Sequence, residues 1–221
     1  MFYIFSPMDN NQILLQLSAT EQRVLGVLVE KSKTTPDYYP MTISALTNAC
    51  NQKTSRNPVV DYDEETVTLT LNTLKIKGLV STATGGSSRA IKYKHNLAIV
   101  YPLLPSELAV LCLLLLRGPL TPGEINSNSA RLYEFETIEE VQEIMQKLAA
   151  DSPAYTIQLP KKAGQKEARY QHLFGGEVQE EEVTVTATIA AAPDSQALEL
   201  RVSKLEEELA EVKEMLNLLL N

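Results

Sequence analysis

The sequence predicts a mainly helical α+β protein, built from two tandem winged helix-turn-helix domains and a C-terminal coiled-coil helix. Three observations predict this fold: an internal repeat, the order of helical and extended patterns within each copy, and an apolar stripe near the end of the chain. The expected boundaries are an N-terminal extension at 1–16, domain 1 at 17–98, domain 2 at 99–176, a flexible acidic linker at 177–197 and the coiled-coil helix at 198–221.

The internal repeat brings two series of residues into alignment. In order, the first series is Glu21, Val24, Leu25, Leu28, Thr35-Pro36, Val67, Leu71, Leu74 and Lys92–His95, and the second is Glu107, Val110, Leu111, Leu114, Thr121-Pro122, Val141, Met145, Leu148 and Arg169–His172. Each copy spans about 70 to 75 residues, which is too large for a solenoid repeat. The repeat therefore indicates a small domain that is present twice.

Each copy opens with an expected helix whose apolar residues recur every three and four positions. In the first copy, Ser18 and Glu21 form a capping box in front of this helix. The second copy lacks the box, but Pro105 suits the first helical turn, and apolar residues surround the helix over 108–115, which predicts deeper burial. A short second helix is expected at 42–50 and again at 122–132.

A third helix and two extended runs complete each copy. The third helix is expected from Asp63, as its N-cap, to Lys77, with Gly78 as the stop signal, and its counterpart at 137–149. Extended runs are expected at 79–83 and 89–94, joined by a flexible tip, and at 155–159 and 168–172, joined by a basic tip. Three helices followed by a β-hairpin are typical of the winged form of the helix-turn-helix.

The end of the chain carries an apolar stripe with alternating steps of four and three. Its members are Leu198, Val202, Leu205, Leu209, Val212, Leu216 and Leu219. If Val202 occupies position a of a heptad repeat, the residues at each position g and at the position e that follows it are opposite in charge. Such pairs attract each other across two parallel helices, which favours a parallel homodimer. The alternative is a single amphipathic helix that docks on its own domain.

Composition and charge limit the location and the partners. The chain shows no signal peptide, and its longest apolar stretch, 108–116, is too short to cross a bilayer, so we expect a cytoplasmic protein without a membrane partner. Cys50 and Cys112 stand in apolar helical contexts, which argues against a disulfide framework. The net charge is −8, but residues 18–98 carry +3, residues 103–176 carry −2 and the tail from 177 onward carries −8. The acidity therefore belongs mainly to the tail.

Three motifs resemble the bacterial YceH-like family. They are Ala49-Cys50-Asn51-Gln52-Lys53-Thr54 with Arg56, Pro58 and Val59; Leu115-Leu116-Arg117-Gly118-Pro119-Leu120-Thr121-Pro122-Gly123-Glu124; and Arg169-Tyr170-Gln171-His172-Leu173-Phe174. The resemblance covers nearly the whole chain after about Leu17 and implies two tandem winged-helix domains and a helical tail. The sequence departs from the family pattern over Ile125–Ala130, where relatives usually carry arginines, and keeps only Arg131.

The outward faces of the third helices suit protein contacts better than phosphate. A step of 100° per residue places Leu69 and Ile76 outward in the first copy, beside Glu65, Asn72 and Thr73. In the second copy the same construction exposes Glu139, Glu143, Gln146, Lys147 and Ala150. Because phosphate contacts supply much of the affinity for nucleic acid, Leu69 and Ile76 are instead candidates for a protein interaction.

Candidates for nucleic-acid binding lie in the loop before the third helix and on the hairpin of domain 1. They are Asn51, Gln52, Lys53, Arg56, Arg89, Lys92 and Lys94. The basic side chains would contact backbone phosphates and the amides would add hydrogen bonds. The alternative is structural: Asn51 and Asn57 form turns, and the charges only solvate a surface.

Nothing in the sequence indicates catalysis. His95 and His172 end equivalent strands and lack nearby ligands at metal spacing, so we expect histidines at the edge of the core, each with a satisfied ring nitrogen, and no metal. Gly85-Gly86 lacks the context of a phosphate loop, and no cofactor is expected. The leading hypothesis is therefore a non-catalytic protein that binds double-stranded DNA and resembles a transcription regulator. The second hypothesis is a scaffold that binds a protein partner, as acidic tandem winged-helix proteins do in chromosome segregation.

Overall fold

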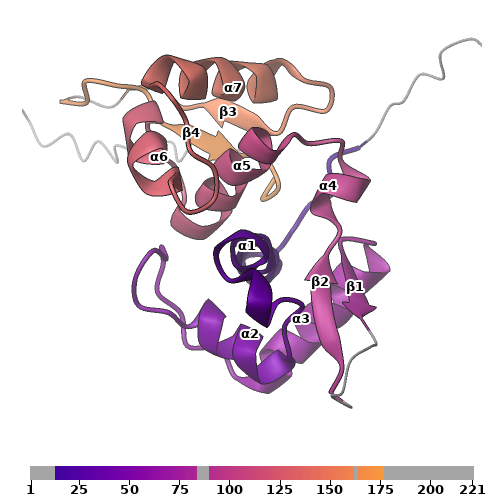
Figure 1. The fold of residues 1–221 in the computed structure, drawn as a ribbon. Helices are drawn as coiled ribbons and strands as arrows, with labels where there is room; N and C mark the ends of the chain where they lie inside the picture. Colours follow the sequence, from indigo (N-terminus) through magenta and orange to yellow (C-terminus); the bar gives the residue numbers. More distant parts are fainter. Residues whose placement is uncertain (1–12, 84–89, 162–163, 177–221) are drawn as a thin grey trace, which may run out of the picture. The chain divides into compact units, whose positions relative to one another are not determined.

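Helices dominate the fold, and the same order of elements occurs in both halves of the chain (Figure 1). The computed structural model describes residues 13–83, 90–161 and 164–176. The first half contains α1 (Ala19–Thr34), the short 3-10 helix η1 (Pro36–Tyr38), α2 (Ile43–Cys50), α3 (Glu64–Ile76), β1 (Val80–Ala83) and β2 (Lys92–His95). After α4 (Leu97–Val100), the second half contains α5 (Pro105–Arg117), α6 (Pro122–Ser129), α7 (Ile138–Ala150), β3 (Thr156–Gln158) and β4 (Tyr170–His172). The expected mainly helical α+β class is confirmed.

Local capping fixes the helix ends close to the predicted positions. The Ser18 hydroxyl accepts a hydrogen bond from the backbone N–H of Glu21, and the Glu21 carboxylate accepts one from the N–H of Ser18, which completes the predicted capping box. Asp63 caps α3, and Gly78, with a φ of 74°, follows its end. In α5, Glu107 accepts from the N–H of Leu104 at 2.8 Å, a partial box that the sequence analysis missed.

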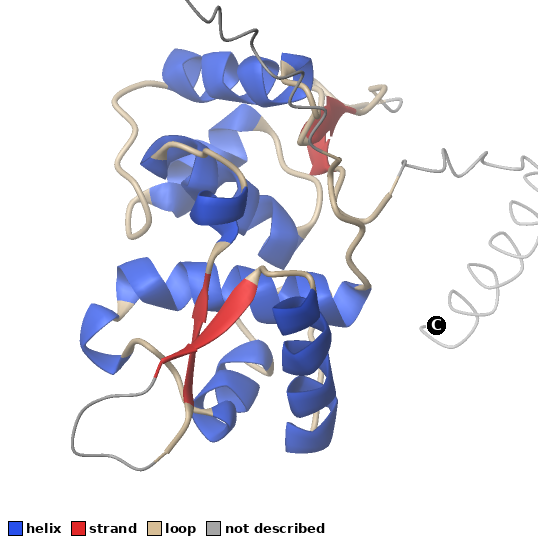
Figure 2. Cartoon of the chain, turned by 90° about the vertical axis from the view of Figure 1, so that its right-hand side faces the viewer, coloured by secondary structure: helices blue, strands red, loops and turns tan. Residues whose placement is uncertain are grey.

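Among the described residues, each half contains one short antiparallel sheet of two strands (Figure 2). Val80 pairs with His95 in the first sheet, and Thr156 pairs with His172 in the second. A single residue from the segment before the second helix adds a bridge to each sheet, because Met41 pairs with Tyr93 and Leu120 pairs with Tyr170. These bridges continue the structural likeness between the halves.

The alignment of the two Thr-Pro dipeptides is wrong. Thr121 is the N-cap of α6, and the equivalent cap of α2 is Thr42. Thr35 and Pro36 instead end α1 and begin η1, a short helix that has no counterpart between α5 and α6, where the structure describes every residue. The first half therefore carries extra residues between its first and second helices, and sequence identity alone misplaced the equivalence.

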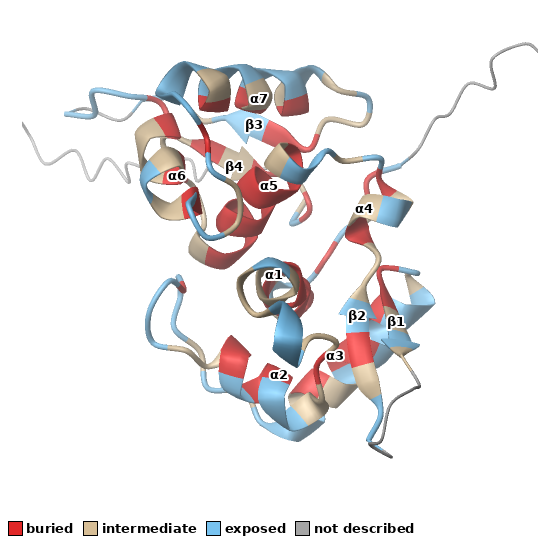
Figure 3. Cartoon of the chain, viewed as in Figure 1, coloured by how far each residue is buried: buried red, intermediate tan, exposed pale blue. Residues whose placement is uncertain are grey.

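The two halves pack against each other through their first helices, α1 and α5, and share one hydrophobic core. Every residue from Glu107 to Leu116 is buried, as the apolar surround of this helix predicted (Figure 3). The thiol of Cys112 donates to the carbonyl oxygen of Gly26 at 3.5 Å, and these two residues occupy equivalent positions of the repeat. Equivalent faces of α1 and α5 are therefore in contact. The described residues form one compact unit. The predicted boundary between two domains therefore stays a prediction.

The segment before α1 also belongs to the core. Leu14 and Leu17 are buried, and the N–H of Leu17 donates to the carbonyl oxygen of Phe174 at 2.6 Å. The N–H of Leu15 donates to the hydroxyl of Tyr101, a fully buried residue whose ring meets Phe174 edge to face. This segment thereby ties the start of the first half to the end of the second.

Several predictions concern residues outside the described ranges. They are residues 1–12 of the N-terminal extension, the linker at 177–197, the hairpin tip at 85–88, Arg89, and the predicted dimer contacts Leu198, Val202, Leu205, Leu209, Val212, Leu216 and Leu219. Within the described ranges, none of the helices has the length and hydropathy needed to cross a membrane.

Candidate binding surfaces

Arg56 lies in the interior of the first half. Its side chain is fully buried, and its guanidinium donates to both carboxylate oxygens of Glu30, at 3.0 and 2.7 Å. It also donates to the carbonyl oxygens of Ala49 and Ser55 and to Oε1 of Gln52. The charge that the sequence analysis assigned to phosphate is therefore already paired within the chain.

Burial alone would raise the pKa of Glu30, but the opposing charges prevail. Hydrogen bonds from Arg56, with its nearby charge, and contact with Lys31 lower the pKa of this carboxyl below its usual value. Nζ of Lys31 lies 3.0 Å from Oε2 of Glu30. Glu30 is therefore a carboxylate that anchors the loop between α2 and α3 to α1.

Three amide side chains of the loop, those of Asn51, Gln52 and Asn57, also form intrachain contacts. Asn51 donates from its side-chain nitrogen to the carbonyl oxygen of Tyr62 at 2.7 Å and accepts from the N–H of the same residue at 2.8 Å. Gln52 accepts from both Arg56 and Lys31. Asn57 bonds to the carbonyl oxygens of Leu116 and Arg117 in the second half. These contacts agree with the structural alternative, in which the asparagines hold turns.

Three of the predicted basic residues remain at the surface. Lys53 and Lys94 are exposed and Lys92 is partly exposed, and none of them forms an ion pair with another residue of the described ranges. Lys53 belongs to the loop between α2 and α3, whereas Lys92 and Lys94 belong to β2. Figure 1 shows this loop on one side of α1 and the hairpin on the other, so the structure separates the two parts of the predicted cluster.

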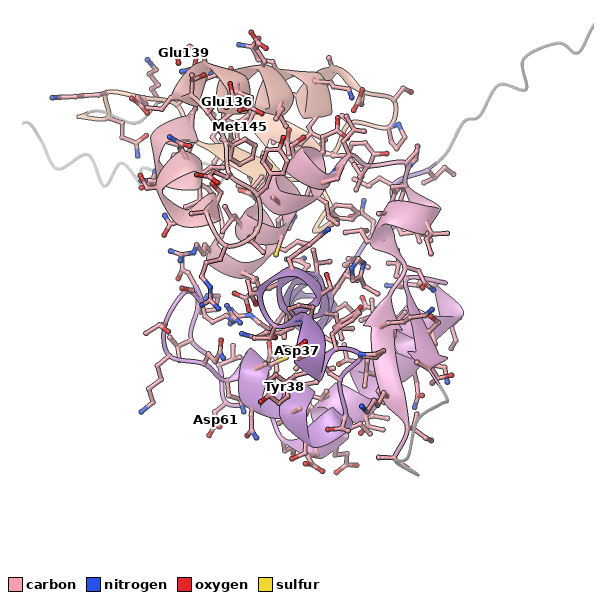
Figure 4. All side chains as sticks on the ribbon, in the orientation of Figure 1. Asp37, Tyr38, Asp61, Glu136, Glu139 and Met145 are labelled. Carbon is pink, nitrogen blue, oxygen red and sulfur yellow. The ribbon has the colours of Figure 1, made fainter. Side chains whose placement is uncertain are left out.

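The outward faces of the third helices match the helical-wheel expectation. Leu69 is 60% exposed and Ile76 is 87% exposed on α3, and Glu65, Asn72 and Thr73 are exposed beside them. On α7, Figure 4 shows Glu139 on the outer side of the helix, whereas Met145 is fully buried. The exposure of Leu69 and Ile76 is confirmed, and their role in a protein contact stays a prediction.

A pocket of about 650 Å³, which the sequence did not predict, lies where α1 and the loop between α2 and α3 face α5 and α6. Basic side chains from both halves line it: Lys31, Lys53, Arg117 and Arg131. No local signal in the sequence brings these positions together, because residues up to 100 apart become neighbours only when α1 packs against α5.

His172 and both cysteines are buried, and His95 is half-buried. Burial lowers the pKa of both His95 and His172 to about 4, with a further contribution from Lys33 at His95. Nδ1 of each ring is buried and lacks a hydrogen-bond partner among the described residues, whereas Nε2 of His95 contacts the Ser32 hydroxyl at 3.3 Å, so His95 has the expected satisfied ring nitrogen. Burial raises the pKa of the Cys50 thiol to about 12. Among the described residues, no group of three or more His, Cys, Asp or Glu side chains is placed to hold a metal ion.

The fold defines a mainly helical α+β protein in which the same order of helices and strands occurs twice. The chain belongs to the family described as "Protein of unknown function, DUF480", whose model matches residues 17–165. It is 43% identical over 215 residues to a UPF0502 protein of Shewanella pealeana, covering 94% of this chain and 100% of that protein. It is also 49% identical over 163 residues to a UPF0502 protein of Opitutus terrae, covering 73% of this chain and 71% of the relative. A UPF0502 protein of Geotalea uraniireducens is 43% identical over 201 residues, which cover 89% and 90% of the two chains. These matches confirm the resemblance that the motifs predicted.

Proposed function

We propose that this chain is a non-catalytic, cytoplasmic binding protein that associates with double-stranded DNA and acts in the manner of a transcription regulator. In this proposal the two halves are tandem winged-helix domains, and the C-terminal stripe joins two chains in a homodimer. The observation that carries the proposal is the set of basic side chains on the first half, Lys53, Lys92 and Lys94, which lack ion-pair partners among the described residues. Arg56 is left out of the proposed contact, because its guanidinium is buried against Glu30.

The separation of the loop from the hairpin determines how such a contact is made. DNA presents one phosphate charge per about 1.7 Å of its axis, so two basic patches can contact different stretches of one backbone. Lys53 would contact one stretch, and Lys92 with Lys94 would contact another (Figure 1). The two contacts should therefore contribute independently to affinity, since residues that share no partner usually act additively.

The test measures binding of a fluorescent duplex at several salt concentrations by anisotropy. K53Q and K92Q/K94Q should each weaken binding, and each lost phosphate contact should flatten the plot of log affinity against log salt by about 0.9. The matched control is K161Q/K166Q, which removes two exposed charges from the hairpin of the second half. Equal loss in the control and in K92Q/K94Q would show that net charge, and not a site on the first half, governs the affinity.

The exposure of Leu69 and Ile76 favours a second candidate function, a scaffold that binds a protein partner through α3. Apolar anchors at an interface carry more energy than charges at its rim. In that case L69S/I76S, and not K53Q/K92Q/K94Q, abolishes capture of a partner that mass spectrometry identifies in a bacterial lysate. Retention of the same partner by L69S/I76S would contradict the scaffold.

A further inference from the structure

The pocket between the halves carries an excess of positive charge. Four basic side chains and a single acidic one, Glu30, line it, which gives the lining +3 in a chain of net charge −8. Glu30 does not offset these charges freely, because Arg56 occupies both of its carboxylate oxygens. Arg131 and Lys53 are exposed and have no ion-pair partner among the described residues. The pocket therefore attracts anions.

The loop that forms one wall of the pocket is held in a defined conformation. The backbone of Ser55 has a φ of 59°, a left-handed conformation that residues other than glycine rarely adopt. Its carbonyl oxygen accepts from the buried guanidinium of Arg56 at 2.9 Å, and its hydroxyl accepts from Arg117 at 2.8 Å. The loop is thus fixed from both halves, which reduces the ordering cost of binding a ligand there.

The remainder of the lining suits an organic ligand. Leu132, which is half-buried, provides apolar surface beside the buried Leu113 and Leu116, and Ser127 and Asn128 provide polar groups. Oγ1 of Thr34, another lining residue, is buried and has no hydrogen-bond partner among the described residues. A volume of about 650 Å³ lies within the usual range for small-molecule sites.

We infer that this pocket binds a small organic phosphate. The phosphate group lies among Lys53, Arg117 and Arg131, since guanidinium forks match phosphate oxygens. The organic body of the ligand rests on the half-buried Leu132. Because both halves contribute to the site, binding also strengthens their association and raises the melting temperature of the protein. This site goes beyond the proposed DNA contact and does not depend on it.

The test is calorimetric titration of the full chain with three probes. AMP carries both a phosphate and an uncharged organic body, inorganic phosphate carries only the charge, and adenosine carries only the body. We expect AMP to bind at least 10-fold more tightly than either of the other probes. R117Q/R131Q should weaken AMP binding by at least 10-fold, and R131Q alone should weaken it by several-fold. R131Q also guards against misfolding, because Arg131 is exposed and forms no ion pair with another described residue.

The matched control is K92Q/K94Q, which removes two charges from the hairpin on the other side of α1 and should leave AMP binding unchanged. The inference is wrong if AMP fails to bind at millimolar concentration, or if R117Q/R131Q and K92Q/K94Q lose it equally. It is also wrong if R117Q/R131Q abolishes binding of duplex DNA and the intact protein does not bind AMP, because the basic residues of the pocket would then bind nucleic acid. Failure of the DNA proposal alone leaves the AMP result unchanged, so the two ideas fail separately.

Discussion

Replacement of Arg56 by alanine tests whether this residue belongs to the interior or to a nucleic-acid surface. The substitution leaves the Glu30 carboxylate, whose side chain is 14% exposed, with Lys31 as its remaining basic partner, and it also removes the donors to Ala49 and Gln52. Breaking a buried ion pair by removing one partner costs about 3–5 kcal/mol. Nε of Arg56 has no hydrogen-bond partner among the described residues, which favours the lower end of this range. We therefore expect R56A to lower the free energy of unfolding by about 3 kcal/mol.

Urea denaturation followed by circular dichroism measures this loss, with K53A in the same loop as the control. Lys53 is exposed, and a surface substitution of this kind usually changes stability by no more than about 0.5 kcal/mol. E30L/R56M, which replaces both partners by apolar side chains, should recover much of the stability, because no unpaired charge remains buried. If R56A costs no more than about 0.5 kcal/mol, the same as a surface residue, the buried pair does not anchor the loop and Arg56 returns to the candidate phosphate contacts.

Three further predictions concern packing, protonation and assembly. G26A should destabilise the protein by about 1–3 kcal/mol in urea denaturation, because a Cβ would lie 2.9 Å from Cδ2 of Leu116. The control G123A, whose Cβ meets no atom within 4 Å, should be neutral or stabilising. A stabilising G26A would contradict the close packing of α1 on α5. His172 takes up a proton near pH 6.5 in the unfolded chain but only near pH 4 in the folded protein, so acid favours the unfolded chain. H172F should therefore remove about 2 kcal/mol of the stability that the protein loses between pH 7.5 and 5. An unchanged loss would mean that His172 titrates normally. Deletion from Ser195 onward should convert a dimer to a monomer in light scattering, and a deletion variant that remains dimeric would move the interface to the domains.

The sequence predicted the elements of the fold well, because their signals are local. The signals that begin or end a helix lie within one or two turns of that helix. They are Ser18 with Glu21 for α1, and Asp63 and Gly78 for α3. The outward position of Leu69 and Ile76 likewise follows from helical periodicity alone. The internal repeat predicted that the second half has the same order of elements, which the structure confirms.

The candidate sites were harder to predict, because their geometry depends on long-range contacts. Arg56 looked like a surface cation, but its partner Glu30 lies 26 residues away on α1. Arg117 and Arg131 join Lys53 in one pocket only because the two halves pack together. Repeat alignment also failed where one half carries an insertion, as the misplaced Thr35-Pro36 shows. Pattern and spacing therefore located secondary structure, but not the pairing of charges.

The salt dependence of duplex-DNA binding tests the proposed function most directly. Anisotropy titrations of the intact protein and of K53Q/K92Q/K94Q, from low to physiological salt, give the slope of log affinity against log salt for each. If all three lysines contact phosphates, the slope of the variant should be shallower by about 2.7, and its affinity at low salt should be far lower. An intact protein that binds no DNA at low salt, or a variant with the same slope and affinity as the intact protein, would contradict the proposal.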